Sequence, residues 1–275
     1  MTALPAAMLR RFAALAVIVN GLFPAIWIFL TSLKTEAELT RTPITWLPQA
    51  PTIANYLRAF HDQPLALYLF NSLTVALMSM ALTLFVSTLA AYALARLEIR
   101  YRDLALAAII AVSTFPLVTL LVPLFQTMRA LNLLNSYAAL VLPYTVLSLP
   151  ICTLVLISFF QTIPLDLENA AMIDGCSRVG ALVRIVVPLS APGVCTAGLL
   201  AFVNSWDEFL LALSFNSATR MRTLPVGITL YQGEFAFPWP VISAALVVGI
   251  VPVVVLIVLF QQRVIAGLTA GGVKG

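Results

Sequence analysis

The sequence predicts an all-α integral membrane protein with six transmembrane helices, on three observations. First, 61% of the 275 residues are hydrophobic, 9% are charged and the mean hydropathy is +1.03, far from the balance of a soluble domain. Second, charged residues divide the chain into apolar stretches of the roughly 20 residues that span a bilayer core. Third, the pattern of the segment between the fourth and fifth stretches, about residues 161–188, predicts two short helices. The six expected spans are residues 12–33, 65–95, 104–128, 136–160, 189–214 and 241–261.

The first stretch resembles a secretory signal peptide at its start, because Arg10 and Arg11 precede an apolar run. That run continues past Pro24 and Trp27 without a small-residue cleavage site. We therefore expect a retained first span.

The distribution of basic residues predicts the orientation of the chain. Six spans place both termini on one side of the membrane, and that side would carry nine basic residues against six on the other. The positive-inside rule then places both termini in the cytoplasm. The nine are Arg10, Arg11, Arg96, Arg100, Arg102, Arg178, Arg184, Arg263 and Lys274, and the six are Lys34, Arg41, Arg58, Arg129, Arg220 and Arg222.

The next three spans differ in length and proline content. The uncharged stretch around residues 65–95 would be about 45 Å long as a helix, so it must tilt strongly or protrude from the bilayer. The third span contains Pro116 and Pro123, and the fourth contains Pro143 and Pro150. Prolines seven residues apart share a helical face, so we expect both spans to be kinked. Kinks suit a pathway that opens and closes, although proline is also commoner in membrane helices generally.

The fifth span contains Asn204, Asp207 and Glu208. Carboxylates at membrane depth are costly and mark a polar pathway, a partner charge or a helix end. Counted from Pro188, Asp207 lies about 28 Å along the helix, which equally fits a position in water at the far interface. If the pathway interpretation holds, we expect Asn204 and Asp207 to face inward together. The candidate pathway residues are Asn71, Asn204, Asp207 and Glu208.

Composition argues against several other site classes. Cys152, Cys176 and Cys195 are isolated and odd in number, and the single histidine, His61, stands beside Asp62 in a polar loop. We therefore expect no metal site, no disulfide and no catalytic centre. The net charge of +4 forms no basic run, so we also expect no nucleic-acid binding.

The cytoplasmic segment of about residues 161–188 is bounded by Pro164 and Pro188. Gly175 permits a positive φ at the end of a first short helix, and Ser177 can cap a second one that Pro188 ends. Helices this short are marginal alone in water, so a partner surface is expected to hold them.

The first short helix combines an apolar face with two acidic residues, Asp166 and Glu168, in its first turn. An amphipathic helix of this kind can lie on lipid headgroups. Acidic residues fit poorly against an anionic leaflet, however, so we expect docking into a protein groove. The apolar face comprises Leu165, Leu167, Ala170, Ala171 and Ile173.

The run from Leu167 to Pro192, LENAAMIDGCSRVGALVRIVVPLSAP, resembles the signature of permease subunits of bacterial ATP-binding-cassette (ABC) importers. In that family E-A-A, then G, then I-x-L-P mark the helix that contacts the ATPase. The stretch from Trp206 to Leu213 is similar to the carbohydrate-importer branch. The tail from Gly267 to Gly275 is similar to that of the maltose-importer subunit without the large extra loop. Overall, the chain is similar to trehalose-importing permeases.

This resemblance covers roughly the whole chain and implies the type I importer fold, also called MetI-like. In the sugar-importer branch a glutamate usually stands at the place of Asn169, whereas here the carboxylate is one position earlier, at Glu168. Asn169 can form a hydrogen bond but no ion pair. The resemblance gives ATPase-coupling roles to Glu168, Asn169, Ala170, Ala171, Asp174, Gly175, Ser177, Arg184 and Pro188.

The resemblance also implies partners. They are a second, homologous permease subunit in a heterodimer, a dimer of ATPases that bind ATP and magnesium, and an extracytoplasmic sugar-binding protein. The chain itself would bind no cofactor and would not be an enzyme. It would carry a sugar, such as the disaccharide trehalose, across the inner or plasma membrane.

Two other classes compete with this interpretation. An ion-coupled secondary transporter would predict internal repeats and acidic residues in several spans, whereas acidic residues occur here in one span only. An intramembrane enzyme would need convergent catalytic groups, which the sequence does not offer.

Overall fold

The computed structural model describes the backbone of residues 6–233 and 237–272, and the side chains of residues 8, 10–233 and 237–261. Every regular element in this part of the chain is a helix, which confirms the all-α prediction. The helices form two compact units, one from Met1–Ala66 and Gly227–Val251 and the other from Leu67–Val226 and Pro252–Gly275.

The first unit contains α1 (Ala6–Ser32), α2 (Glu36–Leu39), α3 (Ala54–Asp62) and the start of α14 (Trp239–Gly272). The Asn55 amide donates hydrogen bonds of 2.8 Å to the carbonyls of Ser32 and Lys34, which fixes the chain where α1 ends. The apolar part of α1 has no buried residue within this unit. Its large apolar side chains are exposed.

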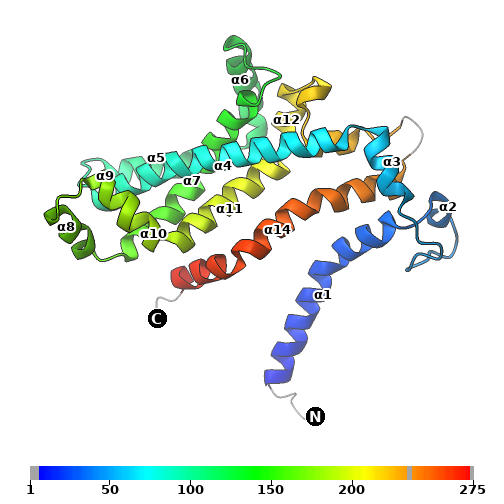
Figure 1. Ribbon diagram of the computed structural model, residues 1–275, viewed down its shortest axis with the longest axis horizontal. Helices are drawn as coiled ribbons and strands as arrows, with labels where there is room; N and C mark the ends of the chain where they lie inside the picture. Colours follow the sequence, from blue (N-terminus) through cyan, green and yellow to red (C-terminus); the bar gives the residue numbers. More distant parts are fainter. Residues whose placement is uncertain (1–5, 234–236, 273–275) are drawn as a thin grey trace. The chain divides into compact units, whose positions relative to one another are not determined.

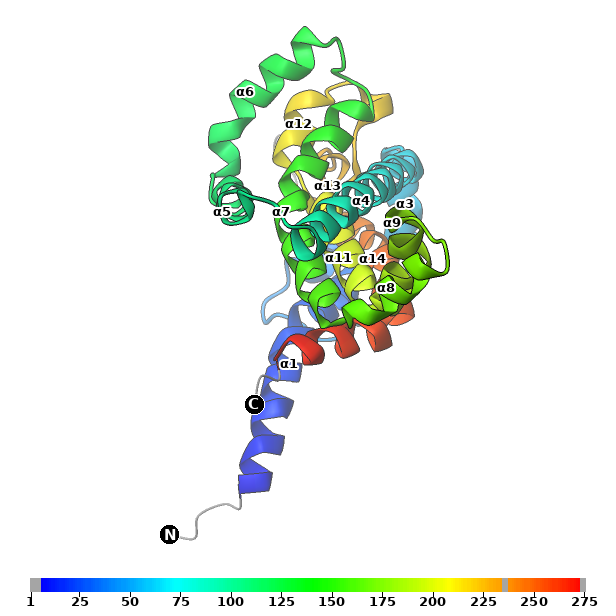
Figure 2. The same ribbon diagram turned by 90° about the vertical axis from the view of Figure 1, so that its left-hand side faces the viewer.

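The second unit contains the remaining helices and the end of α14, except for the first two residues of α4 and the second half of α13, which belong to the first unit. Its long helices are α4 (Leu65–Arg96), α7 (Ala138–Thr162) and α11 (Ala191–Asp207), which run side by side in Figures 1 and 2. The shorter elements are α5 (Arg102–Ser113), α6 (Leu117–Ala130), α8 (Leu165–Ile173), α9 (Arg178–Ala181), a π-helical turn (Leu182–Val186), α10 (Val187–Leu189), α12 (Leu210–Phe215), a 3-10 turn (Thr219–Met221) and α13 (Leu224–Thr229).

Two apolar cores hold the second unit together. One lies between α4, α7 and α11 near α8, and includes Leu156, Phe160 and Val186. The other lies near α6 and α12, and includes Tyr144 and Phe215. Each of these five side chains is at most 2% exposed, so burial of apolar area stabilises both ends of the helical layer.

Four described helices, α1, α4, α7 and α14, are long and apolar enough to cross a membrane. Two helix pairs pass the same test only when each pair counts as one bent span, which gives up to six spans. The observed bounds of α4 and α7 follow the expected second and fourth spans within two residues. Helix α14 extends beyond the expected sixth span to Gly272, and the tail residues 273–275 lie outside the described residues.

The third and fifth spans are not continuous helices: the bend expected in the third is confirmed, whereas the interruption of the fifth was not expected. The third is broken before Pro116, where α5 and α6 meet at 96°, because proline disfavours a helical residue before it. The fifth is interrupted at Glu208, and an 84° bend at Ser190 separates it from the short helical piece before it. By contrast, α7 continues without a break through Pro143 and Pro150.

Candidate functional site

The segment between α7 and α11 begins where α7 ends, and Pro164 precedes the first residue of α8. Gly175 has a φ of +87°, and the Ser177 hydroxyl accepts a hydrogen bond of 3.1 Å from the Gly180 amide. Both features confirm the predicted helix end and helix cap. Figure 2 shows α8 and α9 in front of the ends of the long helices.

The second helical piece was expected to end at Pro188, but it ends one residue later, at Leu189. Proline has no amide hydrogen, so the helix cannot form the usual bond at this position. A π-helical turn precedes it instead, in which the Val187 amide donates to the Leu182 carbonyl. The chain then bends sharply at Ser190 into α11.

Helix α8 turns its apolar side chains outward. Leu165, Leu167 and Ile173 are 53%, 45% and 86% exposed. Among residues 165–173, all of which the structure describes, Glu168 alone is buried. We call the exposed residues Leu165, Leu167, Ala170 and Ile173 the docking face. Exposed apolar side chains beside polar ones are typical of a surface that a partner protein covers.

Glu168 lies in a buried polar cluster with two residues of α4, Tyr92 and Arg96, which we call the Glu168 cluster. The Tyr92 hydroxyl donates a hydrogen bond of 3.0 Å to Oε2 of Glu168. Arg96 Nε lies 2.7 Å from Oε1 of Glu168, as an ion pair rather than an aligned hydrogen bond. Arg96 Nη2 also donates to the carbonyl of Ile163, at 2.7 Å, between α7 and α8.

The sequence-predicted coupling residues are thus divided. Glu168 points inward, so the expectation that it lies on the surface offered to an ATPase does not fit its burial. Ala171 is half-buried, and the other predicted coupling residues are exposed: Asn169, Ala170, Asp174, Gly175, Ser177, Arg184 and Pro188.

Sequence reasoning missed Tyr92 and assigned Arg96 only to membrane orientation. The two residues stand four positions apart in the last turns of α4, so they share a face of that helix. Two polar side chains at this spacing, at the end of a long apolar helix, could have indicated a polar contact there.

A pocket of about 200 Å³ lies elsewhere in the second unit, lined by Leu117, Tyr144, Leu147, Asn204 and Glu208; we call it the polar pocket for the last two and Tyr144, although most of its surface is apolar. The Asn204 amide donates a hydrogen bond of 3.1 Å to the Ser148 hydroxyl. The structure therefore brings Asn204 together with Glu208, whereas the sequence analysis paired it with Asp207. Asp207 is exposed at the last position of α11.

Glu208 stands where α11 ends and α12 begins. Its carboxylate accepts hydrogen bonds from the Tyr144 hydroxyl at 2.5 Å, and from the Leu211 and Ala212 amides at 2.9 and 3.2 Å. A carboxylate that receives the free amides of a helix start stabilises that start. Glu208 therefore caps α12 as well as lining the pocket.

Asn71 does not line a pathway in this structure, because its side chain is completely buried. Its amide donates to the carbonyls of Arg220 and Arg222, at 3.0 and 2.8 Å, and its oxygen accepts from the Tyr137 hydroxyl at 2.8 Å. Asn71 instead holds the segment before α13 against the first turns of α4.

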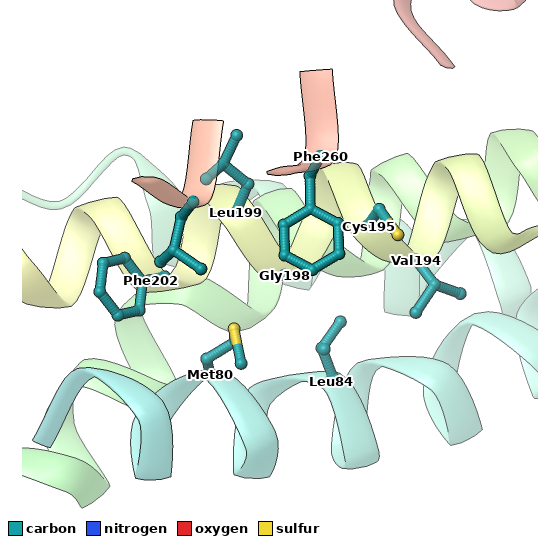
Figure 3. A pocket seen from close by; sticks show the side chains of 9 residues that line it. Met80, Leu84, Val194, Cys195, Gly198, Leu199, Phe202 and Phe260 are labelled. Carbon is teal, nitrogen blue, oxygen red and sulfur yellow. The ribbon is translucent and has the colours of Figure 1, made fainter. Parts of the chain in front are cut away.

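A second pocket, of about 160 Å³, is almost entirely apolar. Its lining comes from α4, α11 and the end of α14, as Figure 3 shows. Sugars need polar partners for their hydroxyl groups, so this pocket does not suit a sugar. The lining residues are Met80, Leu84, Val194, Cys195, Gly198, Leu199, Phe202, Leu256 and Phe260.

Metal-binding chemistry has little support among the described side chains, in which no group of three histidine, cysteine or acidic residues is placed to hold an ion. Cys152 is buried, Cys176 and Cys195 are half-buried, and none of the three forms a disulfide bond. His61 is exposed and lies 3.3 Å from the Asp62 carboxylate.

A helical membrane subunit with an exposed two-helix segment between long apolar helices has the architecture of a transport permease. Residues 84–266 match the family of binding-protein-dependent transport system inner membrane components. The chain belongs to this family. The resemblance to importer permeases is thereby confirmed, and the matched region includes the Glu168 cluster, the docking face and the polar pocket.

Three curated relatives match nearly the whole chain. It is 76% identical to the sulfoquinovosyl glycerol transport system permease protein SmoH of Agrobacterium fabrum, over 97% of this chain and 94% of the relative. It is 39% identical to the trehalose/maltose transport system permease protein MalG of Thermococcus litoralis, over 92% of each chain. It is 37% identical to the trehalose transport system permease protein SugB of Mycobacterium tuberculosis, over 96% and 97%.

The fold also matches a solved structure, that of a bacterial ABC transporter involved in the import of the acidic polysaccharide alginate. The TM-score is 0.79, with 22% sequence identity, over 95% of this chain and 99% of that chain. This match confirms the expected importer fold.

Proposed function

We propose that this chain is one of two membrane subunits of an ATP-driven sugar importer, working with a homologous second permease, an ATPase dimer and an extracytoplasmic binding protein. The family match and the exposed docking face support this assembly. Hydrolysis of ATP would take place on the ATPases, and both termini of this chain would lie in the cytoplasm with the docking face.

For the substrate we propose sulfoquinovosyl glycerol, or a closely similar glycoside of a sulfonated sugar. The observation that carries this choice is the 76% identity over nearly the whole chain to a permease named for that compound. The trehalose expectation rests on relatives that are 39% and 37% identical, so we place trehalose second.

The polar pocket suits the sugar hydroxyl groups of such a substrate better than its sulfonate. The Asn204 amide and the Tyr144 hydroxyl can exchange hydrogen bonds with sugar hydroxyls. Among the five described residues that line the pocket, Glu208 is the charged one, and its negative charge would repel a sulfonate. In this proposal another subunit supplies the positive charge that recognises the sulfonate.

The test is uptake by the complete complex in proteoliposomes, with binding protein outside and ATP inside. We expect accumulation of labelled sulfoquinovosyl glycerol that needs ATP and exceeds the accumulation of trehalose. An ionophore that collapses ion gradients should leave the rate unchanged. Trehalose uptake without uptake of the sulfonated glycoside would overturn the substrate proposal, and uptake driven by an ion gradient would overturn the importer proposal.

A further inference from the structure

The way in which α8 is held points to a specific path for movement through this subunit. Helix α8 follows α7 directly in the chain and lies close to α9 and the π-helical turn, which follow it. Helix α4 is remote in sequence, since Tyr92 and Glu168 are 76 positions apart. Contact between α4 and α8 therefore depends on side chains and not on chain connectivity.

The Glu168 cluster is built as a fixed connection. The Arg96 and Glu168 side chains are only 6% and 4% exposed, so water does not compete for the ion pair. Arg96 joins α4 both to Glu168 and to the Ile163 carbonyl. The apolar residues of α8 point outward, so Glu168 is the buried residue through which α8 contacts α4.

The other end of α4 is fixed in a comparable way. Asn71, in the second turn of α4, holds the carbonyls of Arg220 and Arg222, and the Ser72 hydroxyl accepts from the Leu224 amide at 2.8 Å. Helix α4 is continuous over 32 residues, or about 48 Å. It therefore connects α8 to the segment before α13 through polar contacts at both ends.

We propose that Glu168 is a positioning residue that makes α4 move with α8. In the importer assigned above, on which this inference rests, an ATPase displaces α8 through the docking face. The Glu168 cluster then transmits that displacement to α4, and α4 carries it to residues 220–224 at its far end. Without the cluster, α8 moves with its neighbours in the chain while α4 stays behind.

The experiment compares uptake per ATP hydrolysed in proteoliposomes that contain the complete complex. Glu168→Gln and Arg96→Gln should still assemble with the ATPase and hydrolyse ATP, but transport per ATP should fall about two- to thirtyfold, the range of a coupling change of 0.5–2 kcal/mol. The exchanged pair Glu168→Arg with Arg96→Glu should recover part of the loss. Glu98→Gln, an exposed acid two positions after Arg96 and outside the docking face, is the matched control and should match the wild type.

A purely structural role would lower the amount of assembled complex but leave transport per ATP of the assembled fraction unchanged, and that result would overturn the proposal. Where the charge variants do not assemble, Tyr92→Phe decides by the same ratio, because it removes one hydroxyl group and no charge. A wild-type complex that transports nothing contradicts the proposed function. A wild-type complex that transports normally beside an equally coupled Glu168→Gln contradicts this inference alone.

Discussion

At the scale of single residues, the two glutamates of the site show how similar side chains obtain different roles from their surroundings. Glu208 is half-buried and receives two backbone amides and a tyrosine hydroxyl. Glu168 receives a tyrosine hydroxyl and an arginine. Both carboxylates have charged or hydrogen-bonding partners within the chain, so neither is a free acid that waits for a substrate or a partner subunit.

Replacing Glu208 by alanine should destabilise the subunit, because the first amides of α12 lose their acceptor. The expected loss is about 0.5–2 kcal/mol in the free energy of unfolding, as for other helix caps. Thermal unfolding of the purified subunit in detergent measures it. Asp207→Ala removes the exposed neighbouring carboxylate and should change stability by less than about 0.5 kcal/mol. Equal effects of the two variants would contradict a capping role for Glu208.

Gly175 allows a test in which the backbone alone is strained. A side chain added there would meet no atom within 4 Å, but φ is +87°. Gly175→Val should therefore cost about 1–2 kcal/mol through backbone strain, whereas Gly175→Asn should be tolerated because asparagine adopts positive φ more readily. Co-purification of the ATPase measures the result, and we expect less ATPase with the valine variant only. If equal amounts of ATPase co-purified with the two variants, docking would not depend on the geometry of this turn.

At the scale of helices, α7 and α11 approach closely at one glycine. A side chain at Gly193 would come within 2.4 Å of the Phe159 ring, whereas one at Gly198 would come within 3.2 Å of the end of the Leu84 side chain. The first contact leaves no room for a methyl group, and the second can yield by a small rotation. The packing of this helix pair therefore depends on position 193.

Gly193→Ala should lower the free energy of unfolding by about 1–3 kcal/mol, the usual cost of overpacking a close-packed interior. Gly198→Ala is the matched control on the same helix, and a smaller effect is expected. Thermal unfolding in the same detergent compares them. A Gly193→Ala variant as stable as the wild type would show that Phe159 can move aside without cost.

The sequence predicted the existence of these helices better than their continuity. An uncharged run sets how much chain can lie in lipid, which is why α4 and α7 follow their expected bounds closely. It does not determine where a helix breaks, so the interruption at Glu208 went unpredicted. The φ of Gly175 and the cap by Ser177 were predictable because they depend on neighbouring residues alone.

At the scale of the whole molecule, the same distinction separates the parts of the site. The exposed docking face follows from the local pattern of α8. The direction of Glu168 depends on Arg96 and Tyr92, which are distant in sequence, and Asn71 is buried through the carbonyls of residues 220 and 222. Contacts of this kind arise only when the helices are assembled, so pattern reasoning assigned both residues to surfaces that they do not occupy.

The orientation of the whole chain can be tested on two exposed positions that the sequence analysis places on opposite sides of the membrane. Glu98 follows α4 near the cytoplasmic basic residues, and Ser217 lies in the long loop on the other side. With the three native cysteines replaced, a cysteine at Ser217 should react with a membrane-impermeant maleimide in intact spheroplasts. A cysteine at Glu98 should react only after permeabilisation. The test is useful because the positive-inside rule rests on only nine basic residues against six. The reverse labelling pattern would show that the chain is inverted. The docking face would then lie outside the cell, where no ATPase could reach it.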